Sequence, residues 1–386
     1  MSERLFTPPS RRELAAQACA LAGVREEVAH LNLRHLLGSA RPASPPRDPT
    51  LQQVLEEVTT GETFFFRQSA HFHFLTPLLL EFARHGHVRA WSAGCSTGEE
   101  AHSLAAWASA LVGDHASVEV LGTDIVESRL SIASAGVYGP WSMRNHESCP
   151  FSVVERDGAG YRVLPAVRRL TRFLVHNLLE PRPREAGTFD FIFCRNVLIY
   201  LTPAAATHAV KNLLSALKPR GVLVFAPVDL VGPPEQLTPL GPPELSCYMR
   251  ASEAAPATLA IRQPPAHAKA APSAAPVMQR TSVLARVIER HAEAVSVAEA
   301  GRSRGALRLL DELSGEAAGY VPALLERALL RLRLGENGTA RELAGGVLAR
   351  LEHLDADARV DGPVPLSAAY YRAAALALLE RAGPKR

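Results

Sequence analysis

Four short apolar segments between residues 88 and 194 alternate with helix-forming segments, which predicts a parallel sheet covered by helices. The predicted strands are residues 88–91, 118–122, 173–176 and 189–194, and the clearest helix is residues 101–111. The last two strands are continuous apolar or β-branched runs, as expected of strands buried on both faces. The predicted fold class is therefore α/β, with a doubly wound, Rossmann-like core.

The segment SAGCSTGEE, residues 92–100, joins the first predicted strand to the helix. Gly94 and Gly98 suit a tight turn that presents backbone N–H groups and the positive end of a helix to an anionic or polar cofactor. The glycine spacing departs from the GxGxxG dinucleotide fingerprint, because three residues separate the two glycines. An ordinary strand-to-helix turn is the alternative interpretation.

Polar side chains follow the other predicted strands at their carboxyl ends, where ligands bind in open α/β sheets. Asp124 follows the second strand, Asn177 the third, and Arg195 and Asn196 the fourth. A carboxylate at the position of Asp124 can accept hydrogen bonds from a ribose diol. Alternatively, it is the N-cap of a helix that starts near Glu127.

The α/β pattern stops between residues 139 and 172. Two β-prone runs, residues 151–154 and 161–164, flank a turn rich in aspartate and glycine, which predicts a hairpin. We therefore expect a small antiparallel β insertion at about residues 140–172. Its edge could accept a peptide strand, or it could be a solvent-facing excursion.

Residues 251–280 are rich in alanine and proline, which is typical of a linker. Beyond them, similar residues recur every 34 positions, the period of tetratricopeptide repeats, in the pairs Gly301 and Gly335, Ala306 and Ala340, Leu309 and Leu343, and Leu313 and Val347. Pro322 falls near the end of one such unit, residues 370–383 resemble the first helix of another, and the insertion 355–365 disturbs the register. About two and a half repeats are expected, with a generic helical bundle as the alternative. Such a module would bind a protein partner or another part of the chain.

At the other end of the chain, residues 11–37 have helical spacing and lead into the proline-rich RPASPPRDP, where a helix must end. The formal net charge of +3 on 386 residues gives no support for a nucleic-acid partner. Five cysteines without a CxxC pair, and no signal peptide or long apolar span, indicate a reduced, cytoplasmic setting without membrane insertion. His71 and His73 lack companions at metal-ligand spacing, so no metal site is expected.

Five motifs in order resemble the CheR-type methyltransferases. They are TTGETFFFR at 59–67, WSAGCSTGEEAHSLA at 91–105, LGTDI at 121–125, HNLLE at 176–180 and FDFIFCRNVLIYL at 189–201. The resemblance implies a class I methyltransferase domain over residues 51–250 and an N-terminal helical subdomain at 1–40. Composition and the 34-residue period add the linker at 251–280 and a tetratricopeptide-like domain at 281–386. The resemblance also implies S-adenosylmethionine as cofactor, S-adenosylhomocysteine as product, and glutamates of the chemoreceptor cytoplasmic domain as substrate, with recruitment to receptor clusters.

Position by position, the resemblance implies a role for each site residue. Arg67 and Tyr200 would border the methyl-transfer site and are the catalytic candidates. The cofactor-binding residues would be Thr63, Arg67, Gly94, Glu100, Asp124, Asn177, Leu178, Arg195 and Asn196. Arg67 could pair with a carboxylate of the cofactor or of the substrate, or it could be a surface arginine. Tyr200 could donate a hydrogen bond or face the sulfonium, or it could be a half-buried aromatic residue.

Two segments depart from the family pattern. Gly61 replaces an asparagine, so that one hydrogen bond to the cofactor is expected to be missing. Residues 227–229 replace a His, Ser and Glu of the family. Gly61, together with an N-terminal subdomain that looks abbreviated, leaves open a scaffold that binds the cofactor without transfer. A methyltransferase for another substrate is the second alternative. The chain lacks an NPPY-like segment and a basic stripe, which argues against amino-group or nucleic-acid methylation.

Overall fold

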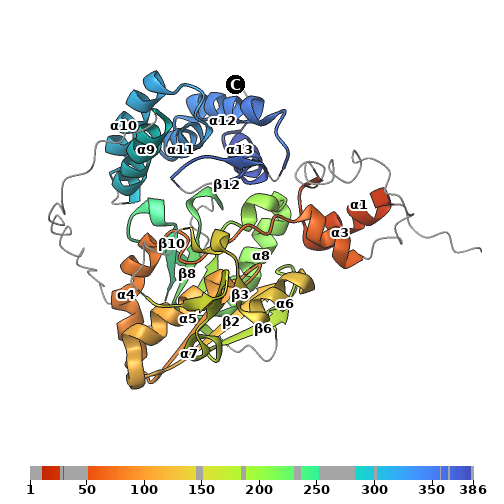
Figure 1. The fold of residues 1–386 in the computed structure, drawn as a ribbon, viewed down its shortest axis with the longest axis vertical. Coiled ribbons are helices and arrows are strands. Elements are labelled where there is room, and N and C mark those ends of the chain that lie inside the picture. The colour runs from red at the N-terminus through yellow and green to blue at the C-terminus, as the bar shows by residue number, and fades with distance from the viewer. Residues whose placement is uncertain are drawn as a thin grey trace, which may run out of the picture.

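The computed structural model describes most of the chain, and the predicted linker at 252–280 and the proline-rich segment before residue 51 lie outside the described residues. The described residues are 11–26, 29, 51–144, 151–183, 188–229, 236–251, 283–299, 302–356, 358–363 and 366–383. Figure 1 shows an α/β core, a small helical arm formed by the first helices, and a group of C-terminal helices stacked on the core.

A seven-stranded sheet with the order β6-β2-β1-β7-β8-β10-β9 forms the centre of the core. The first five strands in this order pair in parallel, and the last two pair antiparallel. Successive strands are added on one side of β1 first and then on its other side, from β7 onwards, so the topological switch point lies between β1 and β7. Ligands bind at this point in doubly wound folds. The predicted α/β fold is thus confirmed. The strands are β1 (His87–Ala93), β2 (Ser117–Asp124), β6 (Thr171–Val175), β7 (Phe189–Cys194), β8 (Leu217–Phe225), β9 (Leu237–Leu240) and β10 (Cys247–Arg250).

Helices cover both faces of the sheet because neighbouring strand residues point to opposite sides. In β7, Phe191 and Phe193 pack into the core cluster that contains α4 and α5, whereas Ile192 and Cys194 belong to the cluster that contains α8. The helices of the core are α4 (Ala70–Ala83), α5 (Glu99–Val112), α6 (Glu127–Ala135), α7 (Pro165–Arg168) and α8 (Pro203–Ala216), with the 3-10 turns η1 (Gly113–His115), η2 (Pro140–Met143), η5 (Leu198–Tyr200), η6 (Pro227–Asp229) and η7 (Pro243–Leu245).

The prediction that both apolar strands are buried on both faces is right for β7 and wrong for β6. All six residues of β7 are buried. β6 has a neighbour on one side only, and Val175 is 52% exposed. An apolar run shows that a strand is able to be buried. Whether the strand lies at the centre or at the edge of the sheet depends on how the other strands pair.

The predicted β insertion is present as a three-stranded antiparallel sheet, in the order β3-β5-β4. Its strands are β3 (Val137–Tyr138), β4 (Val154–Asp157) and β5 (Gly160–Val163). The hairpin turns at Gly158, which has a φ of +58° that suits glycine. The first hairpin strand starts at Val154, where the predicted run ends.

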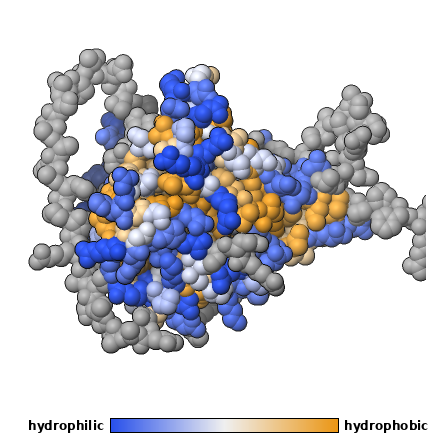
Figure 2. Space-filling model, turned by 90° about the horizontal axis from the view of Figure 1, so that it is seen from below, coloured by the Kyte–Doolittle hydropathy of each residue, from blue (hydrophilic) through white to orange (hydrophobic). Residues whose placement is uncertain are grey.

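Residues 27, 28 and 30–37 of the segment with predicted helical spacing lie outside the described residues. The first part of that segment forms the N-terminal helix α1 (Arg11–Ala22). It ends because Gly23 adopts a φ of +66°, a left-handed conformation that is common after helices. Val24 then forms a bridge with Leu201 of the core. α3 (Leu51–Val58) packs against α1. In the view from below, apolar residues extend along the surface towards the side of this arm (Figure 2).

The C-terminal helices are α9 (Val283–Glu299), α10 (Ser303–Glu316), α11 (Val321–Arg333), α12 (Asn337–Leu351) and α13 (Ala368–Arg381). A short pair of strands, β11 (Arg359–Val360) and β12 (Leu366–Ser367), occupies the predicted insertion. Positions 34 residues apart have matching burial, since Ala306 and Ala340 are both fully buried, as are Leu313 and Val347. Pro322 lies in the first turn of α11. The matching burial supports the repeat hypothesis, and the assignment to tetratricopeptide repeats stays a prediction. Among the described helices, none is long and apolar enough to cross a bilayer.

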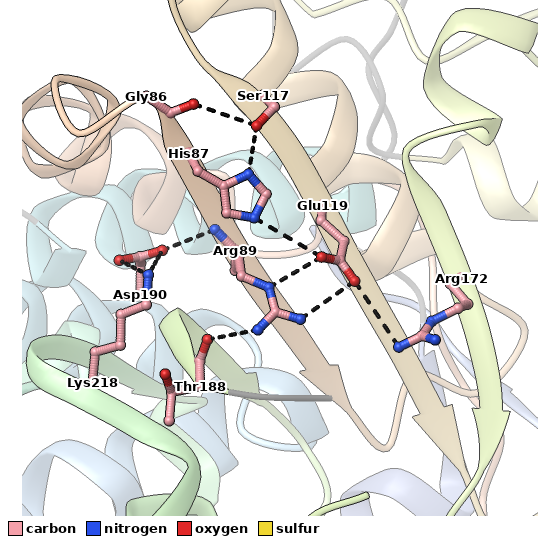
Figure 3. A network of polar contacts seen from close by, with 9 residues as sticks. All are labelled: Gly86, His87, Arg89, Ser117, Glu119, Arg172, Thr188, Asp190 and Lys218. Atoms are coloured by element: carbon pink, nitrogen blue, oxygen red, sulfur yellow. Dashed lines mark hydrogen bonds and ion pairs between the residues drawn. The ribbon is translucent and has the colours of Figure 1, made fainter. Parts of the chain in front are cut away.

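A polar network joins the strands near their amino ends, opposite the edge at which the site lies (Figure 3). The Arg89 guanidinium lies 3.0 Å from the Glu119 carboxylate, and Arg172 approaches the same carboxylate at 4.0 Å. The backbone N–H of Arg89 donates to Asp190, which pairs with Lys218 at 2.9 Å. These contacts connect β1, β2, β6, β7 and β8 and have a structural role.

Replacing Glu119 with glutamine is expected to lower the free energy of unfolding by about 0.5–1 kcal/mol at pH 7, because the carboxylate is partly exposed. The pKa of Glu119 lies below its ordinary value of 4.5, chiefly because Arg89 donates hydrogen bonds to it. A pKa lowered by folding means that the stabilisation is present above pH 4.5 and is lost as the pH falls further. Urea unfolding at pH 7 and at about pH 3 measures this, and a wild-type advantage that persists at the lower pH would contradict it.

Candidate functional site

A cavity lies at the carboxyl ends of β1, β2, β6 and β7. All ten site residues named from the sequence line this cavity, although they come from distant parts of the chain. They are Thr63, Arg67, Gly94, Glu100, Asp124, Asn177, Leu178, Arg195, Asn196 and Tyr200. The structure thus brings the predicted site residues together at the switch point of the sheet.

The turn after β1 is shaped by Gly94, which has a φ of +79°. A Cβ atom at this position would lie 2.7 Å from a methyl group of Val197, so that only glycine fits. The N–H groups of Gly94 and Cys95 both donate to the carbonyl of Thr123 at 2.8 Å. The turn is therefore fixed against the end of β2 and leaves room for a ligand above it.

Asp124 holds the same turn from the end of β2. Its Oδ2 accepts the N–H of Ser96 at 2.8 Å, and its Oδ1 accepts the N–H of Val126 at 3.0 Å. Val126 is the N-cap residue of α6, so the interpretation of Asp124 as the N-cap is wrong. Each carboxylate oxygen has a second lone pair, with which it can accept a ligand hydroxyl.

Glu100 and Arg195 form a buried ion pair beneath the cavity. Nε of Arg195 lies 2.7 Å from Oε2 of Glu100, and the hydroxyl of Ser92 donates to Oε1 at 2.6 Å. The guanidinium of Arg195 also donates to the carbonyl of Arg67 at 2.5 Å and to Nδ1 of His71 at 3.1 Å. Glu100 thus lines the cavity while it is paired with Arg195, and Arg195 in turn holds the backbone of Arg67.

His71 has a structural role in this arrangement. Burial lowers its pKa to about 3, so the ring is neutral. Its Nε2 lies 2.7 Å from the carbonyl of Leu245 and donates to it, which leaves Nδ1 to accept from Arg195. His73 is exposed on the other side of α4. Within the described ranges, no group of three or more potential ligands could hold a metal ion.

The loop after β7 is held by Asp229, which the sequence did not single out as a site residue. Its carboxylate accepts the N–H groups of Asn196 at 2.8 Å, Ile199 at 3.3 Å and Ala226 at 2.9 Å. These bonds fix Asn196 in a left-handed conformation with a φ of +59°. Burial raises the pKa of Asp229 to about 6, although the three donors oppose the rise. The segment 227–229, which departs from the family pattern, thus keeps a carboxylate that shapes the site.

Three polar groups on the cavity wall have no hydrogen-bond partner among the residues that the structure describes. They are the hydroxyl of Thr60, the side-chain amide of Asn196 and Nε2 of His176. Burial lowers the pKa of His176, so its ring is neutral and can donate or accept one hydrogen bond at Nε2. Unpaired buried polar groups are costly, which indicates that a polar ligand satisfies them. His176 was missed although it directly precedes Asn177 in a motif.

The side chain of Asn177 is already engaged by the protein. Its amide donates to the carbonyl of Leu21 at 2.8 Å, and its carbonyl oxygen accepts the N–H of Leu179 at 3.0 Å. The carbonyl of Leu178 accepts from Asn212 at 2.9 Å. These bonds connect the cavity wall to α1 and α8, and contact of Asn177 and Leu178 with a ligand stays a prediction.

Arg129 explains the glycine at position 61. A Cβ atom on Gly61 would lie 2.8 Å from Nε of Arg129, so the guanidinium fills the space beside this glycine. Arg129 donates to the carbonyls of Glu56 at 3.0 Å and Thr59 at 2.7 Å and lines the cavity. The arginine lies 68 positions further along the chain (129 minus 61), so the sequence around Gly61 gives no signal for it.

Arg67 and Tyr200 lie together at one end of the cavity. Each is 8% exposed, so the surface-arginine interpretation of Arg67 is wrong and Tyr200 is more than half buried. The guanidinium of Arg67 donates to the carbonyl of Glu62 at 3.0 Å and lies 5.4 Å from the centre of the Phe64 ring. Burial raises the pKa of Tyr200 although the charge of Arg67 opposes the rise, so the hydroxyl stays protonated and can donate.

Comparison with known proteins agrees with this geometry. Residues 61–238 match the family described as CheR methyltransferase, SAM binding domain. The chain is 36% identical over 191 residues to chemotaxis protein methyltransferase 2 of Pseudomonas aeruginosa, which covers 47% of this chain and 67% of the relative. It is 34% identical over 180 residues to the chemotaxis protein methyltransferase of Salmonella typhimurium, covering 45% and 61%.

A third relative carries a different name. The probable biofilm formation methyltransferase WspC of Pseudomonas aeruginosa is 33% identical over 215 residues, covering 53% of this chain and 50% of the relative. The chain thus spans between half and two thirds of the length of these three relatives. The chain belongs to the CheR methyltransferase family, and its residues 61–238 form the S-adenosylmethionine-binding domain of that family.

Proposed function

We propose that this protein transfers the methyl group of S-adenosylmethionine to glutamate side chains in the cytoplasmic domain of a chemoreceptor, which forms glutamate methyl esters. The observation that carries the proposal is the single cavity in which Arg67 and Tyr200 lie beside the predicted cofactor residues. Residues 51–250 would carry the reaction, preceded by the helical subdomain 1–40, and residues 281–386 would bind a protein partner.

The polar groups of the cavity fit the cofactor. Asp124 has free lone pairs for ribose hydroxyls, and the unpaired groups of Asn196 and His176 face the same space. Glu100 offers a carboxylate to the ammonium group of the methionine part. Gly94 lines the same cavity and shapes the turn after β1.

The reaction needs alignment rather than a general base. S-adenosylmethionine supplies a methyl group on a positively charged sulfur, and the electron pair of the broken C–S bond stays on sulfur as the new O–CH₃ bond forms. A glutamate carboxylate is ionised at neutral pH, since its unperturbed pKa is about 4.3. Arg67 would orient that carboxylate, and the Tyr200 hydroxyl would donate to it or its ring would face the sulfonium. The burial of both residues would exclude water.

Replacing Arg67 with alanine is expected to lower kcat/KM for receptor methylation by about 100-fold or more, because the carboxylate loses its positioning partner. The measurement is transfer of radiolabel from the cofactor to receptors in native membranes, with base-labile methanol release as the signature of an ester. Arg67→Lys keeps the charge but loses the planar fork and is expected to be intermediate. Arg169→Ala, at an exposed arginine of the core, is the matched control.

The outcomes separate the alternatives. Cofactor binding without label in any protein would support the scaffold hypothesis, and label that resists base would indicate another acceptor group. Full activity of Arg67→Ala would contradict the assigned role of Arg67. One relative is named for biofilm formation. If the label appeared in a receptor unrelated to chemotaxis, the proposed reaction would stand, but the receptor would belong to another signalling pathway.

A further inference from the structure

The last helix, α13, lies directly against the end of the cavity that contains Arg67 and Tyr200. It contacts η5, which carries Tyr200, and η6, which carries Asp229. Figure 1 shows the C-terminal helices on one side of the core, with α13 near the core. The C-terminal helices therefore contact the core at the proposed methyl-transfer site, and α9 also contacts it at η7.

Tyr370 of α13 covers the catalytic arginine. The guanidinium of Arg67 lies 5.2 Å from the centre of the Tyr370 ring, while the other aromatic ring beside it, that of Phe64, belongs to the core. Tyr370 is itself only 8% exposed. A cation enclosed between two aromatic rings is stabilised in place and is closed to a protein carboxylate.

A second contact fixes the beginning of α13. Ser367 is its N-cap, and the Ser367 hydroxyl accepts the N–H of Tyr370 at 3.2 Å. Oε2 of Glu62 accepts both the N–H of Ser367 at 3.0 Å and its hydroxyl at 2.8 Å. A carboxylate at a helix N-terminus also interacts favourably with the helix dipole. Glu62 thus connects the segment that carries Arg67 to α13.

The contact is packed like a protein interior. Tyr371, Ala374 and Leu378 of α13 belong to the same hydrophobic cluster as Ile199 of η5 and Val228 of η6. At the far end of the helix, Arg25 of the core pairs with Glu380 at 2.7 Å. The interface is therefore apolar in the middle with polar contacts at its ends.

We propose that α13 is an autoinhibitory lid that occupies the surface to which the glutamate-bearing segment of the substrate binds, so that substrate and lid compete. The inference rests on the proposed function, because it assigns Arg67 and Tyr200 to the substrate carboxylate. The occupied surface accepts a helix with many alanines, including Ala368, Ala369 and Ala373. The partner that fits this surface is accordingly a helix that presents a glutamate between small residues.

The test uses the full chain with two variants that weaken the lid. Glu380→Arg replaces attraction to Arg25 by repulsion at a partly exposed position, and Tyr370→Ala uncovers Arg67. The matched control is Glu336→Arg, which breaks the ion pair with Arg331 among the C-terminal helices themselves. Tyr370→Phe, which keeps the ring, is the control for Tyr370→Ala.

Two measurements follow each variant. Amide hydrogen exchange of residues 368–381, with S-adenosylhomocysteine bound and with or without a chemoreceptor cytoplasmic fragment, reports lid opening without any chemistry. Initial rates of base-labile methylation of the same fragment report access to the site. We expect faster exchange in both lid variants, a rise of about 3- to 10-fold in kcat/KM, unchanged cofactor affinity, and faster exchange of wild-type α13 when the fragment is added.

The failures are distinguishable. If the lid variants exchange faster but methylate at the wild-type rate or more slowly, α13 is a part of the working site and the lid proposal is wrong. The same conclusion follows if the fragment is methylated while α13 stays protected, in which case the substrate would use the neighbouring cavity lined by Thr63, Trp141 and Arg359. If α13 opens but no variant yields a methyl ester, the proposed function is wrong instead.

Discussion

Replacing Asp124 with alanine is expected to weaken S-adenosylmethionine binding by about 100-fold or more and to remove methyl transfer. The substitution removes the carboxylate that we propose as the acceptor for the ribose hydroxyls. It also leaves the buried N–H groups of Ser96 and Val126 without their partner, at a cost of about 1–3 kcal/mol each. About 1.4 kcal/mol of binding free energy corresponds to a factor of ten in affinity, so a 100-fold loss corresponds to about 2.8 kcal/mol. We attribute most of this loss to the missing ribose contacts. Isothermal titration calorimetry measures it.

Because Asp124 also holds the glycine turn, Asp124→Asn is the required comparison. Asparagine keeps one acceptor oxygen for the turn, so we expect a smaller loss of thermal stability than with alanine and still a weakened cofactor affinity. An unchanged affinity in Asp124→Ala would show that the ribose assignment is wrong. A loss of affinity that merely follows global unfolding would be recognised from the unfolding curves.

Replacing Arg195 with alanine is expected to lower the free energy of unfolding by about 3–5 kcal/mol, because it leaves a buried charge without its partner. The Arg195 side chain is 2% exposed, and Glu100, the carbonyl of Arg67 and His71 all lose their bonds to it. Denaturant unfolding monitored by tryptophan fluorescence gives the value.

The exposed pair of Arg220 and Glu81 is the matched control, since Arg220→Ala is expected to cost at most about 1 kcal/mol. The double variant Arg195→Met with Glu100→Gln removes both charges and is expected to recover part of the stability lost in Arg195→Ala. If Arg195→Ala costs no more than Arg220→Ala, Arg195 does not support the site in the way the geometry indicates.

The sequence predicted four of the seven strands of the core sheet, because each of the four is a run of apolar residues that a sheet can bury. It also predicted ten of the residues that line the cavity. The carboxyl ends of the strands indicated Asp124, Asn177, Arg195 and Asn196, because these ends meet at one edge of a doubly wound sheet. The resemblance to the CheR-type methyltransferases implied the others. The local sequence pattern was less informative about where a helix ends and where a strand lies in the sheet. Helical spacing over residues 11–37 gave no sign of the break after α1 at Gly23, and the apolar run of β6 lies at the sheet edge.

Features that depend on residues far apart could not be predicted. Asp229 supports Asn196 from 33 positions further along the chain, and Arg129 fills the space beside Gly61. Ser367 meets Glu62 across 305 positions. No periodicity or motif records such pairings, since each depends on the way in which whole elements pack.

The alanine- and proline-rich stretch before residue 281 invites division of the protein at residue 250, but the packing of α13 argues against that division. Removing the C-terminal helices would leave Ile199, Val228 and the ring of Tyr200 without the apolar side chains that now cover them. A shortened enzyme of this kind would expose a hydrophobic patch beside the proposed active site and would be prone to self-association. Fragments of this protein are therefore poor substitutes for the intact chain, and single substitutions are the better means of separating its parts.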